Sequence, residues 1–337
     1  MRNVAAGVRA LLFGTVALAG LTGTPAVRAE DLPIRIAGAD RDVELRLLHH
    51  ASGRNGRSTA EVVLMLHPYG VPTATAFDVP GFSWMEDLAD RGFDVWAMDL
   101  RGFGGSTRPG GTGPVARASD AVRDVYAVIV HITEGRRTSR VHLVGWSWGG
   151  VVASMVAAAH PDRVDRLVLL GAMHGFKLPL MTQPLEDPTH AGQLNPNLPA
   201  YQVIEPARAL GHWRMMLKGI EDVVSDDTIR QVEDVLLASD ATSGARQPPA
   251  IRRPMGPLVD LYEIWSNRPI YDAGAIRAPT LVIRGDHDLF ADPGLAAKLT
   301  GATRVREIVV PRATHWVPYE AGRAQVLEET ARFLKGS

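Results

Sequence analysis

Apolar runs of strand length recur along the chain and alternate with stretches of helix length. Continuous apolar runs fall at residues 61–66, 94–100, 141–145, 166–170, 280–284 and 306–310. Because such runs carry apolar side chains on both faces, they are typical of strands buried in a parallel sheet. Residues 41–50 alternate more clearly between apolar and polar, which predicts the start of an antiparallel edge.

The stretches between these runs predict helices. In residues 117–134 the apolar positions fall on one helical stripe, and residues 149–159 and 323–334 have a similar pattern. Strands and helices that alternate in this order imply right-handed crossovers between neighbouring strands. The sequence therefore predicts an α/β fold with a doubly wound, mostly parallel sheet.

The alternation stops between residues 173 and 268. This segment is rich in proline and contains a helical run at residues 228–238. Residues 247–257 hold four prolines and two arginines, which indicates a loop. Because so long a segment between two strands is more than a connection, we expect a helical cap at residues 173–268. The α/β core would then comprise residues 30–172 and 269–337.

The first 29 residues have the composition of a secretory signal peptide. Arg2 and Arg9 precede an apolar run of small residues at residues 10–23. Further on, the sequence Val-Arg-Ala ends at Ala29 and has small or modest residues at the −3 and −1 positions of a cleavage site. The run is short for a bilayer span, so we expect cleavage near Ala29 and no stable membrane insertion afterwards. An uncleaved membrane anchor is the alternative. The expected location is secreted or periplasmic.

Composition excludes several classes of function. The 337 residues include no cysteine, which excludes disulfide scaffolds, cysteine-based zinc sites, iron–sulfur clusters and a thiol nucleophile. The 36 Lys and Arg residues nearly balance the 37 Asp and Glu residues. Charge therefore gives no reason to expect nucleic acid as a partner, and we expect a small-molecule substrate.

Residues 145–150 (GWSWGG) carry the clearest catalytic signal. They follow an apolar run and open a predicted helix, so they match the G-x-S-x-G nucleophile elbow in its strand–turn–helix context. Glycines flank Ser147 because the tight turn strains the serine backbone and leaves no room for neighbouring side chains. The alternative is a turn of small residues that only packs a helix on the sheet.

Further motifs give the chain a resemblance to the α/β-hydrolase superfamily. Residues 67–70 (HPYG) end an early strand, where the family has its oxyanion loop, and residues 99–106 (DLRGFGGS) resemble its D-x-R-G-x-G-x-S loop. Residues 285–288 (GDHD) and 314–316 (THW) resemble its acid and histidine loops. The resemblance covers roughly residues 62–334 apart from the cap, in the order Ser, Asp, His that this fold requires.

A serine nucleophile needs a base, and the base needs a partner that fixes its tautomer. Of the eleven histidines only His315 lies after the last predicted strand, and we assign it as the base. The resemblance selects Asp288, three residues past the loop glycine, as the acid, with Asp286 as the alternative. Because adjacent residues do not easily face one ion, we expect no metal at residues 286–288, and we expect no cofactor.

Two backbone N–H groups are expected to form the oxyanion hole. One belongs to Trp148, directly after the nucleophile, and the other to Tyr69, by its place in the early loop. Pro68 departs from the family's His-Gly pattern and cannot donate a hydrogen bond, but it leaves the N–H of Tyr69 available.

Aromatic residues flank the predicted catalytic positions. We expect Trp146, Phe290 and Trp316 to contribute to a largely apolar substrate pocket. For Trp146 and Trp316, packing in the core is the alternative.

The leading hypothesis is an exported serine hydrolase that cleaves carboxylic esters of small to medium, largely apolar substrates through an acyl-enzyme. One alternative resembles proline iminopeptidases and needs cap carboxylates such as Glu205 or Glu263 to hold a free amino terminus. Another is lactone or C–C bond hydrolysis. Halide or epoxide opening is disfavoured, because those relatives carry Asp where Ser147 stands. A non-catalytic binding protein is disfavoured because no triad member is missing.

We expect the exported protein to begin near Glu30. Cleavage would remove three arginines and no acidic residue, so the formal charge would change from −1 to −4. Intact-mass measurement on the protein from culture medium and periplasm tests this. Protein found in the cytosol with Met1 still attached would contradict it.

Overall fold

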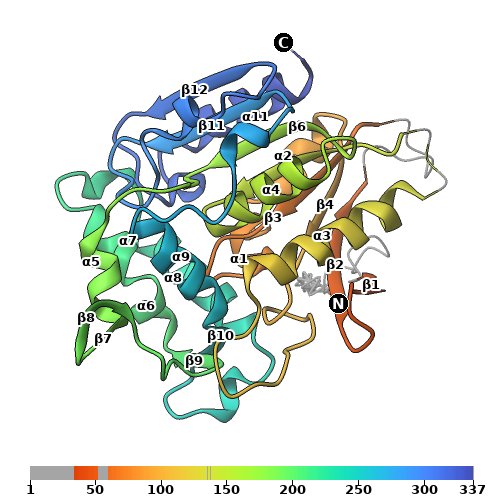
Figure 1. Cartoon of the computed structure of the whole chain (residues 1–337). Coiled ribbons are helices and arrows are strands. Elements are labelled where there is room, and N and C mark those ends of the chain that lie inside the picture. The colour runs from red at the N-terminus through yellow and green to blue at the C-terminus, as the bar shows by residue number, and fades with distance from the viewer. Residues whose placement is uncertain (1–33, 52–59, 135, 137, 337) are drawn as a thin grey trace, which may run out of the picture.

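An eight-stranded sheet forms the centre of the computed structural model, which describes residues 34–51, 60–134, 136 and 138–336 (Figure 1). The predicted signal peptide lies outside these residues. The strand order is β1-β2-β4-β3-β5-β6-β11-β12. The bounds are β1 Ile34–Ala37, β2 Glu44–His50, β3 Val62–Leu66, β4 Asp94–Met98, β5 Val141–Trp146, β6 Val164–Leu170, β11 Thr280–Gly285 and β12 Val305–Val310.

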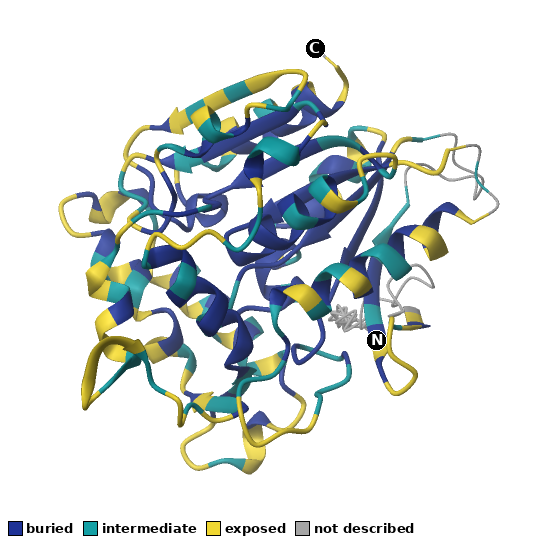
Figure 2. Ribbon diagram, in the orientation of Figure 1, coloured by how far each residue is buried: buried dark blue, intermediate teal, exposed yellow. Residues whose placement is uncertain are grey.

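Neighbouring strands pair in parallel over the part of the sheet that runs β4-β3-β5-β6-β11-β12. Strands β1 and β2 join this part antiparallel. This confirms the predicted α/β fold with a mostly parallel sheet. The predicted antiparallel segment contains β2, but β1 lies outside it at the edge. At the other edge, β12 alternates between exposed and partly buried residues (Figure 2). The expectation of burial on both faces is therefore wrong for this strand, because its alternate residues point to a face that is left exposed at this edge of the sheet.

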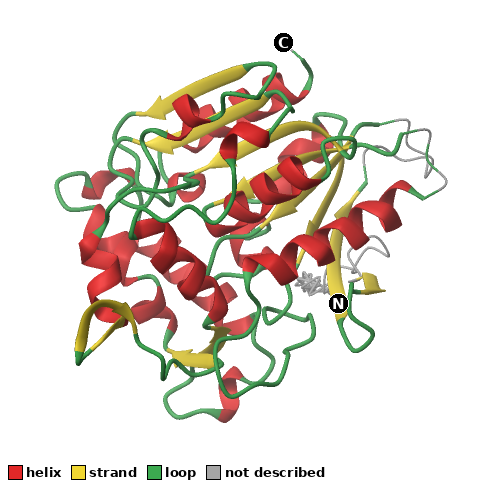
Figure 3. Cartoon of the chain, in the orientation of Figure 1, coloured by secondary structure: helices red, strands yellow, loops and turns green. Residues whose placement is uncertain are grey.

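Helices cover both faces of the sheet, as Figure 3 shows. On one face lie α3 (Ala118–Thr133) and α4 (Trp148–Ala159), and on the other lie α2 (Trp84–Asp90) and α11 (Arg323–Leu334). Two short helices, α1 (Thr73–Phe77) and α10 (Leu295–Lys298), complete this part of the chain. No helix among the described residues is long and apolar enough to cross a membrane.

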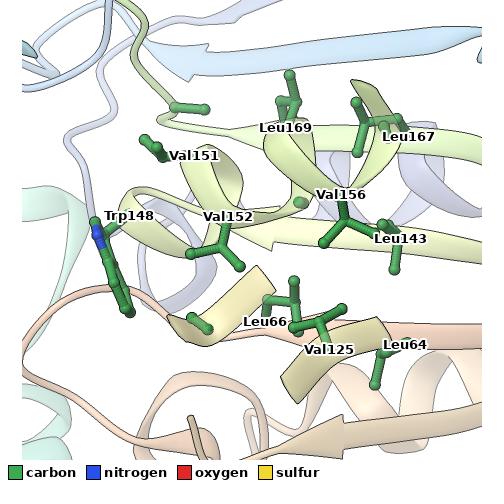
Figure 4. Packing of buried hydrophobic residues seen from close by; sticks show 14 of the residues in the cluster. Leu64, Leu66, Val125, Leu143, Trp148, Val151, Val152, Val156, Leu167 and Leu169 are labelled. Carbon is green, nitrogen blue, oxygen red and sulfur yellow. The ribbon is translucent and has the colours of Figure 1, made fainter. Parts of the chain in front are cut away.

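Strand β3 shows why the apolar runs are continuous. Leu64 and Leu66 belong to the cluster under α3 and α4, which Figure 4 shows with Val125 and Val152. Val63 and Met65, which alternate with them, belong to the second cluster, together with residues of α2 and α11. Because side chains alternate along a strand, a sheet covered on both faces needs apolar residues at every position.

Between β6 and β11 the chain leaves the main sheet; we call residues 171–279 the insertion. It lies below and to the left of the sheet in Figure 1. Its elements are α5 Pro179–Thr182, β7 Glu186–Asp187, β8 His190–Leu194, β9 Tyr201–Ile204, α6 Pro206–Ala209, α7 Gly211–Met216, α8 Asp226–Ala238, β10 Ile251–Pro254 and α9 Gly256–Trp265. Two antiparallel pairs, β7 with β8 and β9 with β10, were not expected in a helical cap.

The prediction of a loop at residues 247–257 is wrong at its centre. Strand β10 occupies Ile251–Pro254 and pairs with β9, about fifty residues earlier in the chain. Pairing with a distant partner overrides the local proline signal, and Pro254 is tolerated because it ends the strand at the edge of a two-stranded sheet.

A buried ion pair fixes the loop that follows β4 to helix α3. The Nε and Nη2 atoms of Arg101 each donate to a carboxylate oxygen of Asp124 at 2.6 Å. Asp124 is fully buried, and it also accepts a hydrogen bond from the backbone N–H of Ala39 at 3.0 Å. Burial by itself would lower the pKa of Arg101, but hydrogen bonds from the guanidinium to Asp124 and Asp40 raise it above the ordinary value.

Asp124→Ala should destabilise the protein by about 3 to 5 kcal/mol, because it leaves the Arg101 charge buried without its main partner. Urea unfolding followed by circular dichroism measures this. Arg123→Ala is the matched control: Arg123 is exposed in its pairs with Asp40 and Asp120, so its loss should cost no more than about 1 kcal/mol. Equal costs for the two variants would contradict the role given to the buried pair.

Candidate active site

Ser147 is the single residue between the end of β5 and the start of α4. Its backbone angles are φ 58° and ψ −122°, a left-handed conformation that is strained for any residue with a side chain. Hydrogen bonds hold the turn: the N–H of Ser147 donates to the carbonyl of Leu170 at 2.8 Å, and its carbonyl accepts from Gly150 and Val151.

Close packing explains the glycines around this turn. A Cβ on Gly145 would lie 2.6 Å from the carbonyl oxygen of Gly149, and one on Gly149 would lie 2.2 Å from that of Leu66. Either distance is far inside van der Waals contact. Helix α4 can therefore approach β3 and β5 closely enough to leave Ser147 at the tip of the turn.

His315 and Asp288 contact each other at the carboxyl end of the sheet. His315 follows β12 and Asp288 follows β11, which is the neighbouring strand. The Nδ1 atom of His315 lies 3.0 Å from Oδ1 and 2.9 Å from Oδ2 of Asp288, and both side chains are buried. The Asp288 carboxylate also accepts the backbone N–H groups of Phe290 and Ala291, at 2.9 and 3.1 Å.

Asp286, the alternative acid, is directed elsewhere. Its carboxylate lies 2.7 Å from Nδ1 of His287 and accepts the backbone N–H of Ala313 at 3.1 Å. Over the described residues no group of three or more His, Cys, Asp or Glu side chains is arranged to hold a metal ion.

Gly171, directly after β6, brings the histidine pair next to the elbow. A Cβ on Gly171 would lie 2.8 Å from both Oδ2 of Asp288 and Nδ1 of His315. Its neighbour Leu170 accepts the hydrogen bond from Ser147 described above. The hydroxyl of Ser147 makes no capping hydrogen bond to α4, and contacts of a catalytic hydroxyl commonly tighten only when substrate binds.

Two backbone N–H groups are available near Ser147. Trp148 opens α4 and Tyr69 follows β3, and neither N–H donates to a backbone carbonyl of the described chain. The loop at Tyr69 is held by His67, which accepts the backbone N–H of Leu100 at Nε2 (3.0 Å) and contacts the carbonyl of Pro68 through Nδ1 (2.9 Å). Burial lowers the pKa of His67, and the neutral ring with its proton on Nδ1 fits both contacts.

The three predicted pocket aromatics occupy different places. Phe290 lies with its ring centroid 5.2 Å from that of His315. Trp146 is fully buried behind the histidine and donates from Nε1 to the backbone carbonyl of His315 at 3.1 Å. Trp316 is buried as well and stacks on Trp213 of α7 at 5.0 Å. Trp146 and Trp316 thus have the surroundings of core residues.

Groups of the insertion that the sequence did not single out complete the site. Asp260 of α9 accepts from Nε1 of Trp148 at 3.3 Å and pairs with Arg117. Burial raises the pKa of Asp260. An acidic residue among the apolar positions of the helix GPLVDLYEIW, whose other acid is the surface residue Glu263, was the available signal for it. His212 of α7 accepts from Nε1 of Trp316 at 3.0 Å, and burial and the nearby His315 and Arg253 lower its pKa to about 3.

Glu320 supports the histidine loop from behind. Its buried carboxylate accepts the backbone N–H of Thr314 at 2.8 Å and Nε1 of Trp213 at 2.8 Å. Burial raises the pKa of Glu320. The residue before His315 is therefore tied through Glu320 to Trp213 of α7.

Comparison with known proteins gives a consistent family. The family model described as alpha/beta hydrolase fold matches residues 62–322. Epoxide hydrolase 3 of Xenopus tropicalis is 26% identical over 308 residues, 88% of this chain and 76% of that protein. The 2-hydroxy-6-oxononadienedioate/2-hydroxy-6-oxononatrienedioate hydrolase of Cupriavidus pinatubonensis is 29% identical over 290 residues, 85% of this chain and 89% of that protein.

Solved structures show the same fold. A thermophilic esterase from Thermogutta terrifontis has a TM-score of 0.59 at 20% identity, over 90% of this chain and 98% of that one. The enol-lactonase from Burkholderia xenovorans has a TM-score of 0.56 at 21% identity, over 90% of this chain and 100% of that one. With the family match, these likenesses show that the chain belongs to the α/β-hydrolase fold family.

Proposed function

We propose that this protein is a serine hydrolase that cleaves carboxylic esters through an acyl-enzyme. Ser147 is the nucleophile, His315 the general base, and Asp288 the partner of the base. The observation that carries the proposal is the contact of the Asp288 carboxylate with Nδ1 of His315, beside a serine held in a strained turn. We also propose that the protein is exported, on the sequence of residues 1–29 alone.

Each group has a distinct task in this mechanism. Asp288 keeps the proton of the ring on Nδ1, so Nε2 of His315 takes the proton of Ser147 as its oxygen attacks the ester carbonyl. The carboxylate also stabilises the imidazolium, which then protonates the departing alcohol. Water, deprotonated by the same histidine, hydrolyses the acyl-enzyme and frees Ser147.

The N–H groups of Trp148 and Tyr69 would stabilise the oxyanion of both tetrahedral intermediates. The N-terminus of α4 adds the positive end of its dipole at the same position. His67 and Asp260 support this arrangement from behind, since they hold the Tyr69 loop and the Trp148 side chain.

The chemistry of serine argues against epoxide opening, although several relatives are named epoxide hydrolases. Attack of a carboxylate on an epoxide gives an ester that water can hydrolyse, whereas attack of Ser147 would give a stable ether. Serine instead suits substrates with a carbonyl group. Hydrolysis of a lactone or of a C–C bond next to a carbonyl is the second candidate. It is supported by the dienedioate hydrolase relative and by the fold shared with the enol-lactonase.

The charges of the insertion do not favour the aminopeptidase alternative. Glu205 is exposed, and Glu263 forms an ion pair with Arg268 at the surface. The charged side chain beside the Tyr69 loop is a cation, Arg253, at 4.6 Å from the ring centroid of Tyr69. A cation there would repel a free amino terminus.

We expect turnover of p-nitrophenyl esters, with the rate depending on acyl length from acetate upward, and no turnover of proline p-nitroanilide. Ser147→Ala should remove ester turnover and labelling by a fluorophosphonate, because no other nucleophile occupies the elbow. Ser154→Ala, which removes the hydroxyl of a serine within α4, is the matched control and should keep both. Ester turnover that survives in the Ser147 variant would contradict the assignment.

Asp288→Asn should lower kcat by about 10⁴-fold, because an amide no longer fixes the tautomer of His315 or stabilises its positive charge. The matched control is Asp286→Asn, in the same loop but directed at His287, and it should stay within a few-fold of the unchanged protein. Steady-state kinetics on one ester, with circular dichroism to verify folding, measures both. The opposite ranking would transfer the role to Asp286.

A further inference from the structure

Arg253 projects from the insertion onto the loop that carries the proposed oxyanion N–H. Its Nη1 atom lies 2.7 Å from the position that a Cβ on Gly70 would occupy. Its guanidinium carbon lies 4.6 Å from the ring centroid of Tyr69. Because Gly70 and Tyr69 follow β3 beside the elbow, a permanent positive charge lies at the wall of the candidate active site.

The pairing of β9 with β10 orients this side chain. Gln202 of β9 stands opposite Arg253 of β10 in the ladder. The Nε and Nη2 atoms of Arg253 both donate to Oε1 of Gln202, at 3.0 and 2.8 Å. One edge of the guanidinium is thereby fixed, and Nη1 is left to face the Tyr69 loop, where the Tyr69 side chain is close enough to interact with the guanidinium.

Arg253 also forms no ion pair with any described carboxylate. Arginines in the same region do: Arg108 and Arg246 both pair with Asp240. The buried carboxylates of the site are already engaged, because Asp288 binds His315 and Asp260 pairs with Arg117. A partly buried cation without a counter-ion is unfavourable in the empty site and becomes favourable when an anion binds.

A second donor lies next to it. The hydroxyl of Tyr69 is buried, and no described residue accepts its proton, since its neighbour Arg253 can only donate. Burial raises the pKa of this hydroxyl, so it keeps its proton and can donate. His212, whose pKa is about 3, is neutral and adds no second charge. The site thus offers one fixed cation and one neutral O–H group, a combination that suits a carboxylate.

We propose that Arg253, oriented by Gln202 and assisted by the Tyr69 hydroxyl, binds a free carboxylate on the substrate. The substrate class is then a carbonyl compound with a second, anionic end, such as the monoester of a dicarboxylic acid. This proposal rests on the proposed function, because it assigns specificity within the same site. It refines the expected substrate pocket from largely apolar to apolar with one cationic subsite that binds an anion.

Two esters that differ only in charge test the proposal: monophenyl adipate and its methyl-capped diester, phenyl methyl adipate. We expect kcat/KM to favour the anionic ester, and Arg253→Met to reduce that preference by about 10- to 100-fold, since charged hydrogen bonds have this magnitude. Arg253→Lys keeps the charge but loses the planar guanidinium with its paired N–H donors. It should therefore retain more of the preference than Arg253→Met does.

Arg252→Met is the matched control. Arg252 precedes Arg253 in β10, so its side chain points to the opposite face, where it covers the ring of Tyr201 with 4.9 Å between guanidinium carbon and centroid. Its loss should leave the charge preference unchanged. A preference for the neutral ester, or a preference that Arg253→Met does not change, would overturn the proposal.

Binding separates this inference from the proposed reaction. Ser147→Ala protein, which cannot turn substrate over, is titrated calorimetrically with adipate. The affinity should fall about 10- to 100-fold when Arg253→Met is added. If neither ester is hydrolysed but adipate binds in an Arg253-dependent way, the carboxylate-binding subsite is supported and the proposed ester hydrolysis is contradicted. Absence of adipate binding that depends on Arg253 would overturn the subsite even if esters are hydrolysed.

Discussion

The left-handed backbone of Ser147 is the constraint on which the other features of the site depend. Such a conformation costs about 1 to 3 kcal/mol and persists only where its surroundings hold it. Here the hydrogen bond from Ser147 to Leu170 and the contact of α4 with β3 through Gly149 supply that hold. Both contacts require β5 to lie between β3 and β6. The order of the strands therefore determines the position of the serine.

The same order brings the second half of the site into place. Strand β11 pairs with β6 and β12 with β11, so the loops that follow them emerge at the edge where α4 begins. Gly171 leaves room for the contact between Asp288 and His315 at that point. The insertion then adds what the sheet lacks: Asp260 holds Trp148, His212 holds Trp316, and Arg253 provides a fixed charge.

Membership of the family leaves the reaction open, because the same fold serves relatives named for epoxides, dienedioates and esters. The side chains narrow the choice. A serine at the elbow with a carboxylate–histidine pair beside it suits attack on a carbonyl group. A cation directed at the oxyanion loop suits a substrate with an anionic end. The first argument concerns the bond that breaks, and the second concerns recognition, so they can be tested separately.

The sequence by itself determined the parallel sheet, the elbow and its surrounding glycines. Continuous apolar runs and a strand–turn–helix motif are local signals that survive in any packing of the chain. Resemblance to the family, rather than spacing, pointed to Asp288 over Asp286. Only the tertiary structure decided the rest. Strands β9 and β10, the place of Arg253 and the contact between His212 and Trp316 each join segments about fifty or more residues apart, and no local pattern records such a pairing.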